Sequence, residues 1–368
     1  MQPELIRRLP KTDLHVHLDG SLRLSTLIDL ARERKVRLPS QTEEGLRAQV
    51  FRPRYRDLGE YLEVRFAPQL HVQPGFELAD VVKAVDRGLR RAGEAYNRRP
   101  EVASGAEPRF AAGIILCALR FFLPEFSTGY RRFFDAMPEA PPAEVYSTAS
   151  MEVARAAARL RREQGLLVVG VDLAGREKGY PADDHRQAYQ VAHEAFLGKT
   201  VHAGEDYGPE SIFQAIGDLH ADRIGHGTWL FDETKIRDPR ITERRRYVEE
   251  LAQFVDYKRI TVEVCLTSNQ QTVPELADDL SKHPFGEMRR RRLSCTLCTD
   301  NRLVSDTTVS NEIARAVDAF ALTSGELRDL LMYGFKRSFF PGTYQEKRTY
   351  VRQVIDYTNR LIATAGAQ

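Results

Sequence analysis

The chain has 368 residues, of which 42% are hydrophobic and 29% charged, as in an ordinary globular protein. This composition excludes a fibrous repeat and a mainly disordered chain. The 54 Lys and Arg residues nearly balance 52 Asp and Glu residues, and the formal net charge of +2 favours neither a nucleic-acid nor a membrane partner. Four cysteines are too few for a disulfide scaffold and fit a reducing compartment, so we expect a cytoplasmic protein.

No segment predicts a membrane span or a secretion signal. Met1 to Pro10 lacks the apolar stretch of a signal peptide. The longest apolar run, Phe110 to Leu119, is far shorter than the roughly 20 residues that cross a bilayer, so it predicts a buried strand.

Short apolar or β-branched runs alternate with helical patterns along the chain. The predicted strands are Asp13–His17, Leu62–Ala67, Phe110–Ala118, Leu166–Leu173, Lys199–His202, Arg223–His226, Ile260–Leu266 and Leu293–Thr299. The predicted helices between them are Leu24–Lys35, Leu78–Arg99, Ser150–Gln164, His185–Phe196, Pro209–Leu219, Arg244–Val255 and Pro284–Arg291. Eight strands with intervening helices indicate a parallel (β/α)8 TIM barrel. A doubly wound open sheet also alternates, but the count of eight and the motifs below favour the barrel.

Three further helical patterns follow the last strand, at Asn311–Phe320, Ser324–Phe335 and Gln345–Ile362. We expect them to close and cap the barrel. The stretches Arg99–Pro108 and Pro138–Pro142 are interpreted as loops because they are rich in Gly or Pro. Without a repeat or a linker, residues 1–368 are expected to form a single domain.

The first candidate site lies in the segment from Asp13 to Gly20. Side chains on a strand alternate between faces, so Asp13, His15 and His17 point the same way, as does Asp19 if the strand continues that far. Two imidazoles at one strand end can bind one metal ion. Alone this pattern is a weak signal, because such histidines are more often ordinary surface or core residues.

Three later strands also end in polar residues. His202 ends the fifth strand, and Glu205 follows it in the loop; Glu205 could instead stabilise the dipole of the next helix. His226 ends the sixth strand between two glycines, which permit close approach. Asp300 follows the eighth strand and offers a carboxylate.

Together these residues indicate an active site more strongly than any one of them, because the carboxyl ends of barrel strands meet at one rim, where barrel enzymes have their active sites. Three histidines and one aspartate suit Zn²⁺ or a similar divalent ion, which makes hydroxide available near neutral pH. His226 and Glu205 would remain available for proton transfer.

Other polar patterns are interpreted as structural. Cys295 and Cys298 form a C-x-x-C pattern, but on a strand their thiols lie on opposite faces, and we expect core residues. The remaining histidines show no catalytic pattern and are expected to be structural or on the surface: His71, His185, His193, His220 and His283.

An ordered set of motifs resembles the adenosine deaminase family of the metal-dependent amidohydrolase superfamily. The matching segments are Leu9–Ser21, Val171–Gly175, His202–Glu205, Gly225–Gly227, Glu263–Asn269 and Thr299–Leu303. They follow the family order over most of the chain, and the set is far more specific than any one motif. The resemblance implies a (β/α)8 barrel with one Zn²⁺ per chain at its carboxyl-terminal mouth. By these motifs, the metal ligands would be His15, His17, His202 and Asp300.

The resemblance also implies roles in attack of hydroxide on C6 of a purine, with ammonia as the leaving group. Glu205 would share a proton with purine N1 and must be protonated to donate it, while His226 would orient the hydroxide. Asp300 would also accept the proton of the attacking water. Gly175 would bind purine N3 through its backbone N–H, and Asp19 would bind a ribose hydroxyl.

Two features depart from the family pattern. Asn301 stands where the family often has Asp, and its amide can donate to purine N7. The Asp300–Asn301 pair resembles a bacterial subset of the family. The connection from Arg56 to Leu62 is short, which leaves either a deletion or residues omitted from the sequence.

The leading hypothesis is a zinc-dependent hydrolase that deaminates adenosine or 2′-deoxyadenosine. The alternative is a deaminase of another 6-aminopurine, such as aminodeoxyfutalosine, adenine or an N6-substituted adenine. A non-catalytic protein that binds purine nucleosides is a lower alternative, because it would not need the whole residue set. The partner we expect is a small-molecule purine nucleoside, and a homo-oligomer is possible.

Overall fold

A closed barrel of parallel strands organises the molecule. The computed structural model describes residues 3–49, 61–277 and 279–366, and in them the sheet runs in the order β1 to β8. The strands are β1 (Thr12–His17), β2 (Tyr61–Phe66), β3 (Ala111–Leu119), β4 (Val168–Ala174), β5 (Gly198–Ala203), β6 (Arg223–His226), β7 (Thr261–Val264) and β8 (Cys295–Leu297). Each lies within two residues of its predicted bounds.

The sheet closes between β8 and β1 through one short parallel contact. A bridge pairs Val16 with Asp300, just beyond the end of β8. The main-chain N–H of Asp300 donates to the carbonyl of His15 over 2.8 Å, and the N–H of His17 donates to the carbonyl of Asp300 over 2.7 Å. The predicted TIM barrel is therefore confirmed, and the doubly wound open sheet is excluded.

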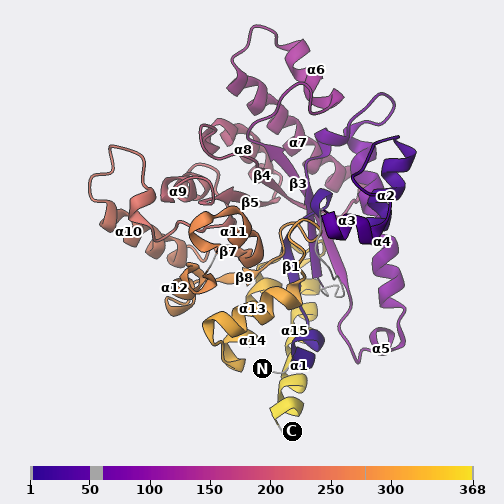
Figure 1. Ribbon diagram of the computed structural model, residues 1–368, viewed down its shortest axis with the longest axis vertical. Helices are drawn as coiled ribbons and strands as arrows, with labels where there is room; N and C mark the ends of the chain where they lie inside the picture. Colours follow the sequence, from indigo (N-terminus) through magenta and orange to yellow (C-terminus); the bar gives the residue numbers. More distant parts are fainter. Residues whose placement is uncertain (1–2, 50–60, 278, 367–368) are drawn as a thin grey trace.

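Helices surround the strands in the order expected for a barrel (Figure 1). Those before β8 are α1 (Pro3–Arg8), α2 (Leu24–Glu33), α3 (Glu43–Gln49), α4 (Leu78–Asn97), α5 (Pro100–Ala103), α6 (Thr128–Ala136), α7 (Pro142–Gln164), α8 (Arg186–Glu194), α9 (Pro209–Gly217), α10 (Arg244–Tyr257), α11 (Leu266–Thr272) and α12 (Phe285–Arg290). Every predicted helix is present.

Some sequence-based boundaries were wrong. Helix α7 begins at Pro142, eight residues before the predicted Ser150, because proline fits the first turn of a helix, where no N–H donor is needed. Helix α5 occupies part of the segment Arg99–Pro108 that was expected to be a loop. The patterns also missed α1, α3, α6 and α11, which have at most nine residues each.

The last three helices close one side of the barrel, as predicted. They are α13 (Val309–Phe320), α14 (Ser324–Arg337) and α15 (Tyr344–Gly366). Helix α14 packs against β1 and β8, and α15 packs against α14 and α1. Gly334 permits this approach, because a Cβ atom there would collide with Thr12. In Figure 1 these helices gather with α1 near both ends of the chain.

Between β1 and β2 the chain forms a small hydrophobic cluster of its own. Leu24 and Ile28 of α2 pack with Leu46 of α3 and with Leu303, which follows β8. This confirms a helix in the predicted crossover Leu24–Lys35. The short connection noted from Arg56 to Leu62 falls largely on residues 56–60, which lie outside the described residues.

The interior of the barrel is charged, which the sequence patterns did not predict. Arg223 of β6 pairs with Glu63 of β2 over 2.5 Å and with Glu263 of β7 over 2.6 Å. Arg65 of β2 pairs with Glu263 over 2.7 Å and with Asp172 of β4 over 3.2 Å. These strands are not all neighbours in the sheet, so the pairs cross the interior. All five side chains are almost fully buried.

Within the described residues, no helix combines the length and the apolar composition required to span a bilayer.

Candidate metal centre and active site

Four side chains converge at the carboxyl-terminal mouth of the barrel. They come from the end of β1, from β5 and from just after β8, and they are His15, His17, His202 and Asp300. One nitrogen or oxygen atom of each lies within 4.8 Å of all the others. The Nε2 atoms of His17 and His202 are 3.1 Å apart, and Asp300 Oδ1 lies 3.4 Å from His17 Nε2 and 3.5 Å from His15 Nε2.

This cluster fits a divalent cation. The Nε2 atom of His15 is buried and has no hydrogen-bond partner, although it points at the other three groups. Burial lowers the pKa of His17 to about 4 and also lowers the pKa of His202, which favours the neutral imidazoles that bind metals. Three nitrogen atoms and one carboxylate oxygen match the donors that zinc takes in catalytic sites.

Two buried carboxylates orient the imidazoles. Glu263 Oε2 lies 2.9 Å from His15 Nδ1, and the Asp172 carboxylate lies 3.1 Å from His202 Nδ1. Burial alone would raise the pKa of Glu263, but Arg65 and Arg223 lower it below its usual range. An ionised carboxylate only accepts, so each ring carries its proton on Nδ1 and presents the lone pair of Nε2 to the cluster.

Glu205 and His226 lie together beside the cluster. Glu205 Oε2 is 3.4 Å from His226 Nε2, and Thr272 Oγ1 donates to Glu205 Oε1 over 3.0 Å. The Glu205 side chain is 25% exposed and His226 only 2%, so Glu205 faces the mouth and His226 lies beneath it. The ring of His226 contacts the ring of His15, with centroids 4.9 Å apart.

Strained backbone positions these groups. His226 and Asp300 have φ values of +66° and +60°, in the left-handed region that non-glycine residues seldom occupy. Gly225 is also required, since a Cβ atom there would lie 2.9 Å from His15 Cε1. The sequence predicted that glycine allows close approach to the imidazole of His226, whereas the close approach at Gly225 is to the imidazole of His15.

Opposing influences act on the pKa of His226. Burial lowers this pKa, but the nearby carboxylates of Glu205 and Asp300 outweigh burial and raise it above its ordinary value.

A third carboxylate, missed in the sequence, shapes the loop that carries Glu205. Glu177 is buried and accepts hydrogen bonds from the main-chain N–H groups of Gly204, Glu205 and Asp206, over 2.9, 2.8 and 3.1 Å. The hydroxyl of Ser211 donates to it over 2.5 Å. Three successive N–H groups around one carboxylate form an anion-binding turn, which fixes the main chain of the loop.

The expected substrate-binding residues lie around the same mouth. Gly175 follows β4 with a φ of +92°, which only glycine adopts readily. Asp19 does not continue the strand but begins a short 3-10 turn, with its side chain 42% exposed. Asn301 packs against Gly20, where a Cβ atom would overlap its amide. The structure thus brings Asn301 next to the Asp19 turn.

His71 was expected to be structural or on the surface. Its side chain is 44% exposed, but its Nε2 atom lies 3.7 Å from Asp19 Oδ1. His71 therefore belongs to the surroundings of the Asp19 turn.

Ser268 and Asn269 of α11, the helix that follows β7, also belong to the site. Ser268 donates to Asp300 Oδ2 over 2.6 Å. The amide of Asn269 lies 3.1 Å from His226 Nδ1, and its oxygen lies 3.1 Å from Nε2 of His283. His283 was expected to have no catalytic pattern, yet it reaches the site through Asn269. The position of Ser268 and Asn269 after a strand was the signal that could have identified them.

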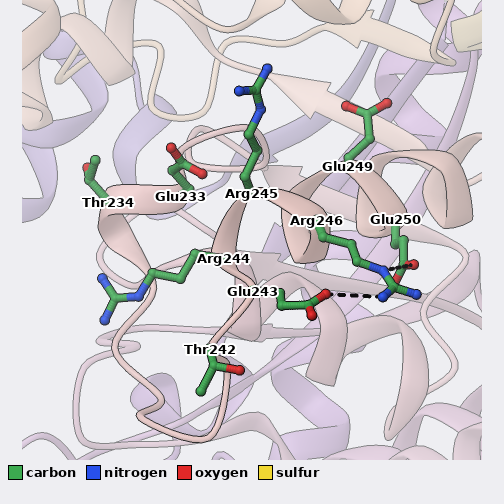
Figure 2. A pocket seen from close by; sticks show the side chains of 9 residues that line it. All are labelled: Glu233, Thr234, Thr242, Glu243, Arg244, Arg245, Arg246, Glu249 and Glu250. Carbon is green, nitrogen blue, oxygen red and sulfur yellow. Dashed lines mark hydrogen bonds and ion pairs between the residues drawn. The ribbon is translucent and has the colours of Figure 1, made fainter.

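A separate surface cavity of about 1020 Å³ lies between the turn after β6 and α10 (Figure 2). Its walls are charged and threonine side chains. Figure 2 shows Arg246 between Glu243 and Glu250, whereas Arg244 and Arg245 point in different directions. None of the residues expected to act in catalysis lines this cavity, so we do not assign it to the reaction.

A sequence model described as adenosine deaminase matches residues 10–60 and 125–357. Adenosine deaminase 1 of Streptomyces coelicolor is 33% identical over 390 aligned positions, which cover 96% of this chain and 88% of the relative. The alignment is longer than this chain, so the relative has residues without a counterpart here.

Solved structures share the fold. The N6-mAMP deaminase of Arabidopsis is 25% identical with a TM-score of 0.67, covering 96% of this chain and 99% of that one. A zinc-bound amidohydrolase of Burkholderia ambifaria is 19% identical with a TM-score of 0.73, covering 100% and 95%. The family model spans most of the chain, and the Streptomyces relative exceeds 30% identity along nearly all of it. This chain therefore belongs to the adenosine deaminase family, whose members are hydrolases.

Proposed function

We propose that this protein deaminates adenosine and 2′-deoxyadenosine by hydrolysis, giving the inosine nucleosides and ammonia. One observation carries the proposal: a carboxyl group and an imidazole, Glu205 and His226, lie 3.4 Å apart against a cluster of three histidines and one aspartate. Membership of the family supports the reaction class. The name of the Streptomyces relative supports adenosine as the substrate, over the other 6-aminopurines considered.

We propose that the cluster of His15, His17, His202 and Asp300 holds one Zn²⁺. The lowered pKa values of His17 and His202, the lowered pKa of Asp300 and the unpartnered Nε2 of His15 support this assignment. A Zn²⁺ ion bound there would lower the pKa of water toward neutrality. No other part of the proposal depends on the identity of the metal.

The proton transfers are assigned to residues beside the cluster. Glu205, at the open side, would donate a proton to purine N1, which makes C6 more electrophilic. His226, buried beneath it, would orient the attacking water through Nε2. Asp300 would accept a proton of that water, while Ser268 holds its other oxygen by a 2.6 Å hydrogen bond.

Three residues around the mouth would hold the nucleoside. The backbone N–H of Gly175 would donate to purine N3, an approach that its φ of +92° and missing side chain permit. The amide of Asn301 would donate to N7. Asp19, on the exposed turn beside Asn301, would bind a ribose hydroxyl.

An ultraviolet deamination assay on zinc-loaded protein tests the proposal. Adenosine, 2′-deoxyadenosine, adenine and N6-methyl-AMP would be compared at equal concentration, with Glu205→Gln as the inactive control. We expect the two nucleosides to have the highest kcat/KM. Turnover of only adenine or N6-methyl-AMP would refute the substrate assignment, and no turnover of any purine would refute the reaction.

A further inference from the structure

A chain of buried hydrogen bonds runs from α12 to the candidate catalytic histidine. The main-chain N–H of Phe285 donates to His283 Nδ1 over 3.0 Å. His283 Nε2 lies 3.1 Å from Asn269 Oδ1, and Asn269 Nδ2 lies 3.1 Å from His226 Nδ1. His283, Asn269 and His226 are each at most 2% exposed, so water does not compete for these bonds.

The direction of every bond follows from the first one. A main-chain N–H can only donate, so Nδ1 of His283 is an acceptor and carries no proton. Burial lowers the pKa of His283 to about 3, so the ring is neutral and its single proton lies on Nε2. That proton is donated to an oxygen, which fixes the amide orientation of Asn269. The NH2 group of Asn269 then faces His226, whose Nδ1 must accept.

We propose that His283 and Asn269 are positioning residues that keep the proton of neutral His226 on Nε2. With its proton there, the ring presents a donor toward Glu205 Oε2, 3.4 Å away, and toward the space where the attacking water would lie. With its proton on Nδ1, the ring would present only a lone pair. The expected effect on catalysis rests on the proposed function, whereas the position of the proton on His226 does not.

The neighbouring imidazoles show the opposite arrangement. Nδ1 of His15 faces Glu263 and Nδ1 of His202 faces Asp172, so both rings carry the proton on Nδ1 and offer Nε2 as a ligand. Their centroids lie only 4.9 and 5.4 Å from that of His226. The partner at Nδ1 therefore decides what Nε2 can do. A carboxylate partner leaves Nε2 with a lone pair that can bind a metal, whereas the Asn269 amide leaves Nε2 with a proton to donate.

Asn269 also connects His226 to Glu205. Its Nδ2 atom lies 3.4 Å from Glu205 Oε1, in addition to 3.1 Å from His226 Nδ1. The two hydrogens of one NH2 group can serve these two acceptors. Turning the amide over would place oxygen against both acceptors, so the donor from His283 fixes both contacts at once.

The first test needs no substitution. In the zinc-loaded protein labelled with ¹⁵N-histidine, long-range ¹H–¹⁵N correlation spectra report which ring nitrogen carries the proton, and His226→Gln assigns the signal. We expect neutral His226 to be protonated at Nε2. A proton on Nδ1 would overturn the inference.

The decisive variant is Asn269→Asp, which changes one NH2 group into an acceptor at nearly constant shape. A carboxylate opposite Nδ1 should move the proton of His226 to Nδ1. A comparable wrong-tautomer substitution in a serine protease costs about 10⁴ in kcat, so we expect a loss of about 10³ to 10⁴, with KM changed only a few-fold. Zinc should remain at one per chain. Gln271→Glu makes the same chemical change at an exposed neighbouring position and should leave kcat unchanged.

A second pair of variants guards against misfolding. In His283→Gln, the new amide can still donate to Asn269, so we expect kcat to be largely retained. In His283→Leu, the donor is lost, and we expect a reduced kcat and mixed protonation of His226. Equal kcat in both variants, or an Asn269→Asp protein with normal kcat, would overturn the inference. If the wild type deaminates no purine but the spectra still follow Asn269, the positioning role stands and the proposed function fails.

Discussion

The main-chain N–H of Asp300 donates to the carbonyl of His15, and this 2.8 Å bond joins the last strand of the barrel to the first. The same residue supplies the carboxylate of the candidate metal cluster, 3.5 Å from Nε2 of His15. The contact that closes the barrel therefore also places the Asp300 carboxylate in the cluster, and the left-handed backbone of Asp300 is part of both arrangements.

Substitution of Asp300 by Ala tests the cluster without removing this main-chain contact. We expect bound zinc to fall well below one per chain after dialysis, and activity to be lost with it, because the cluster loses its only oxygen atom. Elemental analysis measures the metal, and circular dichroism checks the fold. Asn301→Ala, at the adjacent position, should keep the metal. Full zinc content in Asp300→Ala would contradict the ligand assignment.

Substitution of Glu205 by Gln should separate catalysis from metal binding. Glutamine keeps the shape and can still accept from Thr272, but it cannot give up a proton to the purine. We expect zinc at one per chain and a loss of about 10² to 10⁴ in kcat. Glu250→Gln on the surface of α10 is the matched control and should behave as wild type. Near-normal turnover of Glu205→Gln would show that Glu205 is not the proton donor.

Glu177→Gln should loosen the loop that carries Glu205. The glutamine NH2 group would face main-chain N–H groups that now donate to a carboxylate. Leaving these N–H groups without an acceptor costs about 1–3 kcal/mol. We therefore expect hydrogen exchange at residues 204–206 to quicken by about 5- to 150-fold and kcat to fall. Glu210→Gln is a matched control, because Glu210 accepts from the N–H groups of Arg237 and Asp238. It should quicken exchange there and not at residues 204–206.

Acid should destabilise the protein partly through His185. Burial, aided by Arg120, lowers the pKa of this imidazole to about 3, against about 6.5 in the unfolded chain. Between these values the unfolded state binds more protons, so the free energy of unfolding decreases as pH falls from about 6.5 toward 3. The slope for one group is about 1.4 kcal/mol per pH unit. Urea unfolding at several pH values should show a slope shallower by about this amount in His185→Gln; equal slopes would contradict the assignment.

Arg65→Met should destabilise the interior of the barrel strongly. It would remove the positive charge that pairs with the fully buried carboxylates of Glu263 and Asp172. Removing one partner of a buried ion pair typically lowers the free energy of unfolding by about 3–5 kcal/mol, and we expect a loss of that size here. Denaturant unfolding measures the change. Arg132→Met, which breaks an exposed pair with Glu77, should change stability little. A similar decrease in the free energy of unfolding in the two variants would contradict a larger contribution of the interior ion pairs to stability.

The sequence predicted those parts of the molecule that depend on local pattern. Each strand run was bounded well, and residues at strand ends such as His15 and His202 could be placed on one rim from the barrel topology alone. The start of α7 could not be placed well, because Pro142 ends a proline-rich loop and also begins the helix.

Groups that act through distant partners could not be predicted. Arg65 and Glu263 are 198 positions apart, and nothing local shows that they meet inside the barrel. His283 reaches His226 only through Asn269, and Glu177 reaches the Glu205 loop from the preceding strand end. Such partners are specified by tertiary packing, which local periodicity does not encode.

The wide spacing of the cluster along the chain has a consequence during protein synthesis. His15 and His17 leave the ribosome early, His202 follows much later, and Asp300 comes after more than four fifths of the chain. A growing chain therefore carries isolated imidazoles but no complete set of donors until the last strand docks. Incomplete or truncated chains would not compete for the metal supply of the cell, and the ion would be acquired only by finished barrels.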